Sequence, residues 1–98
     1  MLADINGDAA HQSAKEIEAS GGEALAVTVD VSEQEQTESM AEQAIARFGK
    51  IDGLVNNAAI AIRVHHTRAP LEEIPVDEFD RMLAVNLKGV FLCSRAVV

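Results

Sequence analysis

The stretch from 54 to 60, with the sequence Leu-Val-Asn-Asn-Ala-Ala-Ile, constrains the fold of this chain more than any other. An apolar run typical of a buried strand ends there in two amides and two small residues. Strands buried on both faces of a parallel sheet have such apolar runs, and open α/β sheets bind ligands beyond the carboxyl ends of their strands. We therefore predict a strand over 51–56 and a ligand that contacts Asn56 and Asn57.

Two more apolar runs, 1–3 and 24–29, predict strands that are each followed by an aspartate. A segment with helical spacing follows every strand, over 8–20, from about 32 to Gly49, and from about Val76 onward. The order strand, helix, strand, helix, strand, helix predicts an α/β fold with a parallel sheet and right-handed crossovers.

Local signals refine two of these helices. Ser32 and Glu35 have the spacing of a capping box, in which both side chains bond amides at the helix start. Gly89 indicates close packing, because glycine costs a helix about 1 kcal/mol relative to alanine, and Cys93 on the apolar face is interpreted as a core residue. Helical spacing predicts inward faces at Thr37, Met40, Ala41, Ala44, Ile45 and Phe48, and at Phe79, Leu83, Asn86, Val90 and either Cys93 or Ser94.

Composition excludes several classes of protein. The 98 residues allow one domain at most, and the net charge of -8 opposes nucleic-acid binding, which depends on Lys and Arg. A single cysteine cannot form an internal disulfide, and no Cys/His metal framework is present in the sequence. No window has the length of a membrane span, and the first residues lack the pattern of a signal peptide. We expect a cytoplasmic protein with neither a nucleic-acid nor a membrane partner.

Asp4 and Asp30 each follow a predicted strand. In dinucleotide-binding folds an acid at such a position accepts hydrogen bonds from the adenosine ribose hydroxyls and repels a 2′-phosphate. No basic residue follows Asp4 at the next two positions, so this interpretation favours NAD over NADP. Asp30, next to Val31, could accept from an adenine amino group. The alternative for both acids is a turn or capping role without a ligand.

Asn86 lies inside an apolar helical face, where an amide must be hydrogen-bonded or destabilise the helix. A local bond to backbone is one explanation. The other is a functional role, and here the order of residues resembles a known family, the short-chain dehydrogenases/reductases. That family's strand-end Asp, Asp-Val pair, N-N-A-G turn and later helix Asn are matched in order by Asp4, 30–31, 56–59 and Asn86, and 79–91 looks like its long fifth helix.

The resemblance implies a partial Rossmann-type doubly wound parallel sheet over 1–98, a partial NAD(P)-binding domain. It implies an oxidoreductase that interconverts a secondary alcohol and a ketone with NAD, similar to 3-oxoacyl-carrier-protein reductases, and a homodimer or homotetramer as the full-length protein. The family's Asn belongs to a catalytic tetrad with Ser, Tyr and Lys, a role that falls here to Asn86. The implied cofactor-binding residues are Asp4, Asp30, Val31, Asn57, Ala58 and Ala59.

The chain departs from the family pattern in specific places. It has no tyrosine, so the family's Tyr-x-x-x-Lys motif is absent, and the family's Gly-rich pyrophosphate turn is absent too. We therefore expect an internal fragment, inactive alone, that lacks the family's first strand and its later strands. In the family's strand order, 3-2-1-4-5-6-7, this leaves a gap at the centre of the sheet, so the piece should be poorly folded alone or should close in another register. Ala59 replaces the turn's usual Gly and limits its backbone angles, and we expect a less permissive turn rather than a loss of cofactor binding.

Other candidates and functions stay open. His65 and His66 lack a third metal ligand nearby and are interpreted as a solvated pair, and Arg63 and Arg68 as surface charge in the long 61–75 connection. One alternative function is a non-catalytic nucleotide-binding or interaction module without the Tyr and Lys pair. Another is a receiver domain that uses its strand-end aspartates for phosphorylation.

Overall fold

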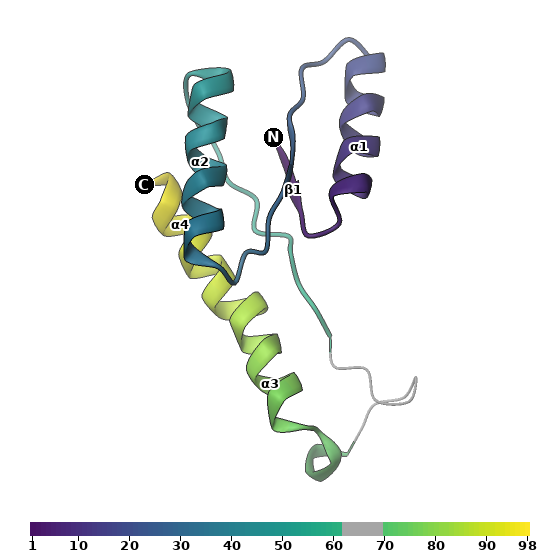
Figure 1. The fold of residues 1–98 in the computed structure, drawn as a ribbon, viewed down its shortest axis with the longest axis vertical. Helices are drawn as coiled ribbons and strands as arrows, with labels where there is room; N and C mark the ends of the chain where they lie inside the picture. Colours follow the sequence, from purple (N-terminus) through teal and green to yellow (C-terminus); the bar gives the residue numbers. More distant parts are fainter. Residues whose placement is uncertain (62–69) are drawn as a thin grey trace.

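The computed structural model describes residues 1–61 and 70–98 (Figure 1). The two predicted N-terminal strands and the three helical segments are confirmed, whereas Arg63, His65, His66 and Arg68 lie outside the described residues. In chain order the elements are β1 (Leu2–Asp4), α1 (Gly7–Ala19), β2 (Ala26–Thr28), α2 (Gln34–Phe48), a 3-10 turn η1 (Leu71–Glu73), α3 (Val76–Leu83), a π-helical turn η2 (Ala84–Lys88) and α4 (Gly89–Val97).

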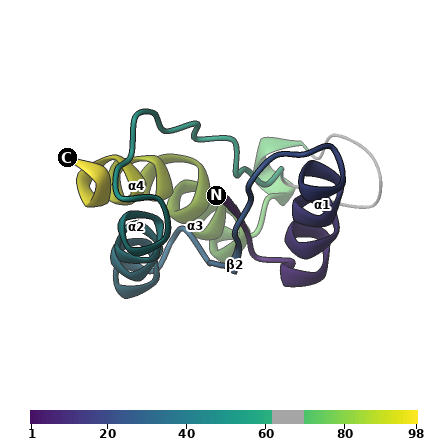
Figure 2. The ribbon, with the colours of Figure 1, turned by 90° about the horizontal axis from the view of Figure 1, so that it is seen from above.

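The sheet consists of two parallel strands, in which Leu2 pairs with Ala26 and Asp4 pairs with Thr28. Backbone bonds continue the pairing at both ends, where the Leu2 amide donates to the Leu25 carbonyl at 2.8 Å and the Val29 amide to the Asp4 carbonyl at 3.0 Å. Helix α1 packs on both strands. Seen from above, α1 lies on one side of the strands and α2 with α4 on the other (Figure 2).

The core joins the end of β2 to helices α2 and α4. Val27, Val29, Met40 and Cys93 form the buried cluster, and Leu25 and Val31 pack against it. Gly89 explains how α4 comes so close to this strand, since a β-carbon there would lie 2.7 Å from Cγ2 of Val31. The prediction of close packing at Gly89 is thereby confirmed, as is the prediction that Cys93 is a core residue.

The start of α1 and the end of α2 are formed by residues suited to those positions, whereas the start of α2 differs from its prediction. The Asn6 side chain accepts from the Ala9 amide at 3.2 Å and caps α1, and Gly49 ends α2 with φ of 79°. The capping box at Ser32 is wrong: α2 begins at Gln34 without a side-chain cap. The cap position is Glu33, one residue after Ser32, and the Ser32 hydroxyl donates to the Asp30 carboxylate at 2.6 Å in a charge-assisted bond.

Two predicted inward faces are only partly correct. On α2, Thr37, Met40, Ala41 and Ala44 are buried, but Ile45 is 48% exposed. On the last helix the buried residues are Val85, Gly89, Leu92 and Cys93, whereas Phe79, Leu83 and Val90 are exposed. Helix α4 packs on α2, but among described elements α3 makes substantial contact only with the following turn η2. The apolar side chains of Phe79 and Leu83 on α3 are left 45% and 39% exposed.

The predicted strand over 51–56 is absent from the sheet, which corrects the expectation of three strands. Residues 51–61 form neither strand nor helix, and Val55 is 87% exposed. The apolar pattern is that of a strand, but a strand needs a hydrogen-bonding neighbour, and in the described residues β1 pairs only with β2. The strands do not close up in another register, and a groove remains between β1 and this segment.

Candidate functional site

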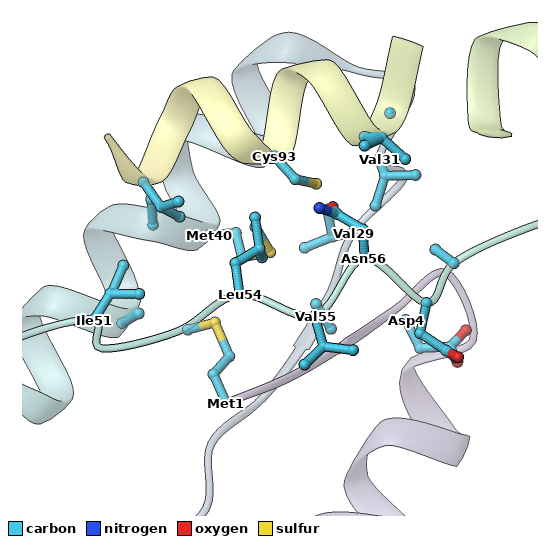
Figure 3. A pocket seen from close by; sticks show the side chains of 18 of the residues that line it. Met1, Asp4, Val29, Val31, Met40, Ile51, Leu54, Val55, Asn56 and Cys93 are labelled. Carbon is cyan, nitrogen blue, oxygen red and sulfur yellow. The ribbon is translucent and has the colours of Figure 1, made fainter. Parts of the chain in front are cut away.

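A groove of about 800 Å³ lies between β1, the segment 51–60 and the helices α2, α3 and α4, and we call it the central groove (Figure 3). It collects the ends of β1 and β2 and the turn after 51–56 on one surface, as expected for the carboxyl edge of a parallel arrangement. Six of the seven predicted site residues line it: Asp4, Asp30, Val31, Asn57, Ala58 and Ala59.

Asp4 is held at the edge of the central groove by the turn that follows β1. Its Oδ1 accepts the Asn6 amide at 2.8 Å, and the Asn6 side chain in turn caps α1. The Asn6 amide thus positions the Asp4 carboxylate. The carboxylate is exposed, which leaves room for hydrogen-bond donors from a ligand. A turn role and a ligand role are compatible at this residue, because a carboxylate can accept about four hydrogen bonds.

Asp30 is positioned more tightly than Asp4. Its Oδ1 accepts the Ser32 hydroxyl at 2.6 Å and the Ser32 amide at 3.0 Å, while Oδ2 lies 3.7 Å from the Arg81 guanidinium on α3. These contacts, the Ser32 hydroxyl bond foremost, lower the pKa of Asp30 below its ordinary value of 3.8. The carboxylate is therefore ionised at neutral pH. Arg81 was not among the predicted site residues, and the sequence marks it only as the one cation among the acidic residues of α3.

Asn86 does not line the groove but holds one of its borders. Its Nδ2 donates to the Ile60 carbonyl and its Oδ1 accepts the Ile60 amide, both at 2.8 Å. The partner lies 26 positions away, so a local bond within the helix does not explain this amide. Asn86 lies in the π-helical turn η2, a rare widening of a helix that is frequent at functional sites. The sequence signalled an amide that needed a partner but not which backbone would supply it.

A second side-chain contact ties the same segment to α4. The Asn56 Nδ2 donates to the Ser94 hydroxyl at 3.5 Å, at the limit of a hydrogen bond. Asn57, the next residue, donates its backbone amide to the Val55 carbonyl at 3.2 Å, which turns the chain at the groove. Residues 56–60 are thus positioned by side chains of the last helix rather than by a neighbouring strand.

The remaining chemistry of the described residues is limited. Burial raises the pKa of the Cys93 thiol, so it stays protonated at neutral pH and is a poor nucleophile. Within 1–61 and 70–98, no cluster of three or more His, Cys, Asp or Glu side chains could hold a metal ion. None of the helices described is both long and apolar enough to cross a membrane.

Sequence comparison finds similar proteins for the whole length of the chain. A profile of the short chain dehydrogenase family matches residues 1–98. The rat hydroxysteroid dehydrogenase-like protein 2 is 44% identical over 88 residues, which are 90% of this chain and 16% of that protein. The uncharacterized oxidoreductase YxbG of Bacillus subtilis is 37% identical over 98 residues, which are 100% of this chain and 34% of that protein. The chain thus spans about a third or less of the length of these relatives.

Solved structures share the arrangement as well. A xylitol dehydrogenase with bound NAD+ superposes with a TM-score of 0.85 and 32% identity, over 97% of this chain and 35% of that chain. A gluconate 5-dehydrogenase from Burkholderia cenocepacia, in complex with NADP and tartrate, gives a TM-score of 0.82 and 35% identity, over 98% of this chain and 36% of that chain. The α/β arrangement of this chain is therefore that of part of a Rossmann-like fold.

Proposed function

Because the chain belongs to the short-chain dehydrogenase family, we propose that residues 1–98 are a partial NAD(P)-binding domain that forms part of the dinucleotide groove of an oxidoreductase. One observation carries the proposal: Asp4, Asp30 and the turn at 57–59, which are far apart in the sequence, line the same groove. Receiver-type phosphorylation at Asp30 has no support from a chain that matches this family over its whole length.

Each residue has a role that fits its surroundings. Asp4 accepts hydrogen bonds from the adenosine ribose, since its carboxylate is exposed and oriented by the Asn6 amide. Asp30 and Val31 lie beside the adenine, with the Asp30 carboxylate held ionised by Ser32. The turn formed by Asn57, Ala58 and Ala59 contacts the nicotinamide ribose, and the small side chains there let the ligand approach the backbone.

The cofactor proposed is NAD rather than NADP. A carboxylate at the adenosine ribose repels a 2′-phosphate, and the residues that follow Asp4 are Ile5 and Asn6, neither of which is basic. The two superposed structures contain NAD+ in one case and NADP in the other, which supports a nicotinamide dinucleotide without choosing between the two. When bound, this cofactor would supply hydride transfer to or from a small-molecule substrate, a secondary alcohol or a ketone.

Asn86 is proposed as the family's tetrad asparagine. Both polar atoms of its side chain bond Ile60, so its contribution from the side chain is to hold the segment that follows the nicotinamide turn. The backbone groups of the widened turn η2 remain the part of this residue that could bind a water for proton transfer. The 98 residues contain no tyrosine, and we propose that proton transfer to the substrate depends on residues beyond them.

A non-catalytic nucleotide-binding module is the second candidate. It is favoured by the presence of the whole set of groove residues in a chain that has no tyrosine. The two candidates make the same predictions for binding and for turnover by these 98 residues alone, and they differ only in whether the full-length protein turns over substrate. The purified 98-residue chain, mixed with NADH and a ketone such as acetoacetyl thioester, should consume NADH no faster than buffer does. Consumption above that background would contradict both the proposed dependence on residues beyond these 98 and the non-catalytic module.

Nucleotide titration of the isotope-labelled chain, followed by amide NMR signals, tests the binding proposal. NAD+ should shift the signals of Asp4, Asp30 and Asn57, and NADP+ should bind several-fold more weakly. Asp4→Asn should weaken NAD+ binding about tenfold and remove the preference, because a hydrogen bond to a charged group contributes about 1.5 kcal/mol or more. Asp8→Asn is the matched control, since Asp8 lies in α1 outside the groove. Unchanged discrimination in Asp4→Asn would refute the ribose assignment.

A further inference from the structure

Arg81 connects α3 to the loop that follows β2. Its Nη2 lies 3.7 Å from Oδ2 of Asp30, and both residues line the central groove. Among described elements α3 makes substantial contact only with η2, the turn that continues the same helix (Figure 1). Extensive packing of α3 on the strands therefore does not account for this pair.

The two oxygens of the Asp30 carboxylate have different surroundings. Oδ1 accepts the Ser32 hydroxyl at 2.6 Å and the Ser32 amide at 3.0 Å. Oδ2 lies 3.7 Å from Arg81, which is longer than a hydrogen bond, and in the described part of the chain no side chain or amide donates to it. A carboxylate oxygen has about two acceptor positions. Those of Oδ1 are occupied, whereas Oδ2 remains able to accept hydrogen bonds from a ligand.

Asp30 is also fixed through its backbone. Its amide donates to Oε1 of Gln36 at 2.8 Å, so the backbone and Oδ1 are both held by residues nearby in the sequence. The contact with Oδ2 is the electrostatic attraction of Arg81, whose side chain is 54% exposed, against 21% for that of Asp30. Ion pairs with this much exposure add little to stability. The expected consequence of the pair is therefore the orientation of Oδ2 rather than the stability of the fold.

The chemistry of Oδ2 can distinguish one base from another. An ionised carboxylate oxygen accepts hydrogen bonds and donates none. It favours a base that presents an N–H donor, and the 6-amino group of adenine is such a donor. A site built to bond a polar group discriminates against an analogue that lacks it, because the group in the site is then left without a partner. The discrimination is only as good as the position of Oδ2 is fixed.

We propose that Arg81 is a positioning residue for adenine: it holds Oδ2 of Asp30 in place to accept the 6-amino group. It thereby sets the preference of the central groove for adenine over a base without that donor. The proposal rests on the proposed dinucleotide function and assigns a further residue to the same groove. Ser32 and Gln36 hold the rest of Asp30, so removal of the Arg81 charge frees only the oxygen that accepts from the base.

Two dinucleotides that differ only at the 6-position of the base test this role: NAD+ and its analogue with purine in place of adenine. Titration of the isotope-labelled chain measures both affinities. The parent chain should bind NAD+ about tenfold more tightly than the analogue, as expected for one hydrogen bond to a charged group. Arg81→Gln should reduce this ratio about threefold, through weaker binding of NAD+ alone. Affinity for the analogue should stay the same, which shows that the variant is folded.

Three further variants isolate the contribution of Arg81. Arg81→Lys keeps the positive charge and should restore most of the ratio. Lys88→Gln removes one charge from η2, outside the groove, and should leave the ratio unchanged. In Asp30→Asn, whose ratio is already lowered, Arg81→Gln should lower it no further, because Arg81 acts through that carboxylate.

The outcomes separate the role of Arg81 from the function on which it rests. Failure of the parent chain to bind either dinucleotide would contradict the dinucleotide proposal and with it the role of Arg81. Binding with a ratio that Arg81→Gln leaves unchanged, or that Lys88→Gln reduces equally, would overturn the role of Arg81 alone. A loss of affinity shared equally by both dinucleotides would overturn it too, because a purely structural contribution produces that result.

Discussion

Two regions of this molecule have similar apolar patterns and different structures. The first region, β1 to α2, forms two parallel strands with helices packed on them, and residues such as Val27 and Val29 are almost completely buried. The second region, 51–61, also has an apolar run that is followed by polar residues, as the runs of β1 and β2 are. It is nevertheless irregular and exposed. The difference shows that an apolar run becomes a strand only where a neighbour supplies hydrogen bonds.

The largest expected effect contrasts Gly89 of α4, which packs against Val31 of the first region, with Gly53 of the second region. Gly89→Val forces a side chain against Val31, which lies 2.7 Å from the position of the β-carbon, and overpacking of this kind costs about 1–3 kcal/mol. Gly53→Val meets no atom within 4 Å and should change the urea midpoint little. Urea unfolding followed by far-UV circular dichroism compares the two variants. Equal losses would show that the two regions are packed alike.

Asn86→Ala should loosen the second region while leaving the first intact. It removes two hydrogen bonds of 2.8 Å to Ile60, worth about 1–2 kcal/mol in total. Amide exchange at Ile60 should accelerate about tenfold, with that at Val29 unchanged. Ser94→Ala, which removes only the 3.5 Å contact with Asn56, is the milder comparison. If both variants leave exchange at Ile60 unchanged, side chains of the last helix do not hold this segment.

The smallest effect is a pH dependence confined to the first region. The folded pKa of Asp30 is lowered, chiefly by the Ser32 hydroxyl, so its stabilising contribution is complete above the ordinary value of 3.8 and is lost as pH falls through the lower folded value. Ser32→Ala should cost about 1 kcal/mol or less at pH 7 and make the fall in urea midpoint between pH 5 and pH 2 shallower. The pKa of Glu38 is lowered too, by Gln34 and Arg95, but this contribution is the same in the parent chain and in Ser32→Ala. Parallel pH profiles would contradict the assigned cause.

Most of the first region could be predicted from the sequence, because its signals are local. Asn6 caps α1 and Gly49 ends α2 through contacts within a few residues, and periodicity found the buried positions Met40 and Ala44. The exception is the start of α2. Ser32 bonds the Asp30 carboxylate, and the helix begins one residue later than the capping box required.

The second region shows what the sequence could not determine. The grouping of Asp4, Asp30 and Asn57 at one groove followed from the order of strands and helices. The contact of Asn86 with Ile60 depends on a tertiary distance, and the π-helical turn that contains Asn86 has no periodic signature. Residues 51–56 could form a strand only beside a neighbouring strand, and the described residues do not provide one.

Site-resolved hydrogen exchange of the 98-residue chain tests the difference between the two regions most directly. The amides of Leu2 and Val29, which are bonded between strands, should exchange slowly. Those of Leu54 and Val55, exposed beside the open groove, should exchange nearly as fast as in an unfolded chain. Slow exchange at Leu54 and Val55 in the isolated monomer would mean that this segment already has a strand partner, and would contradict the account.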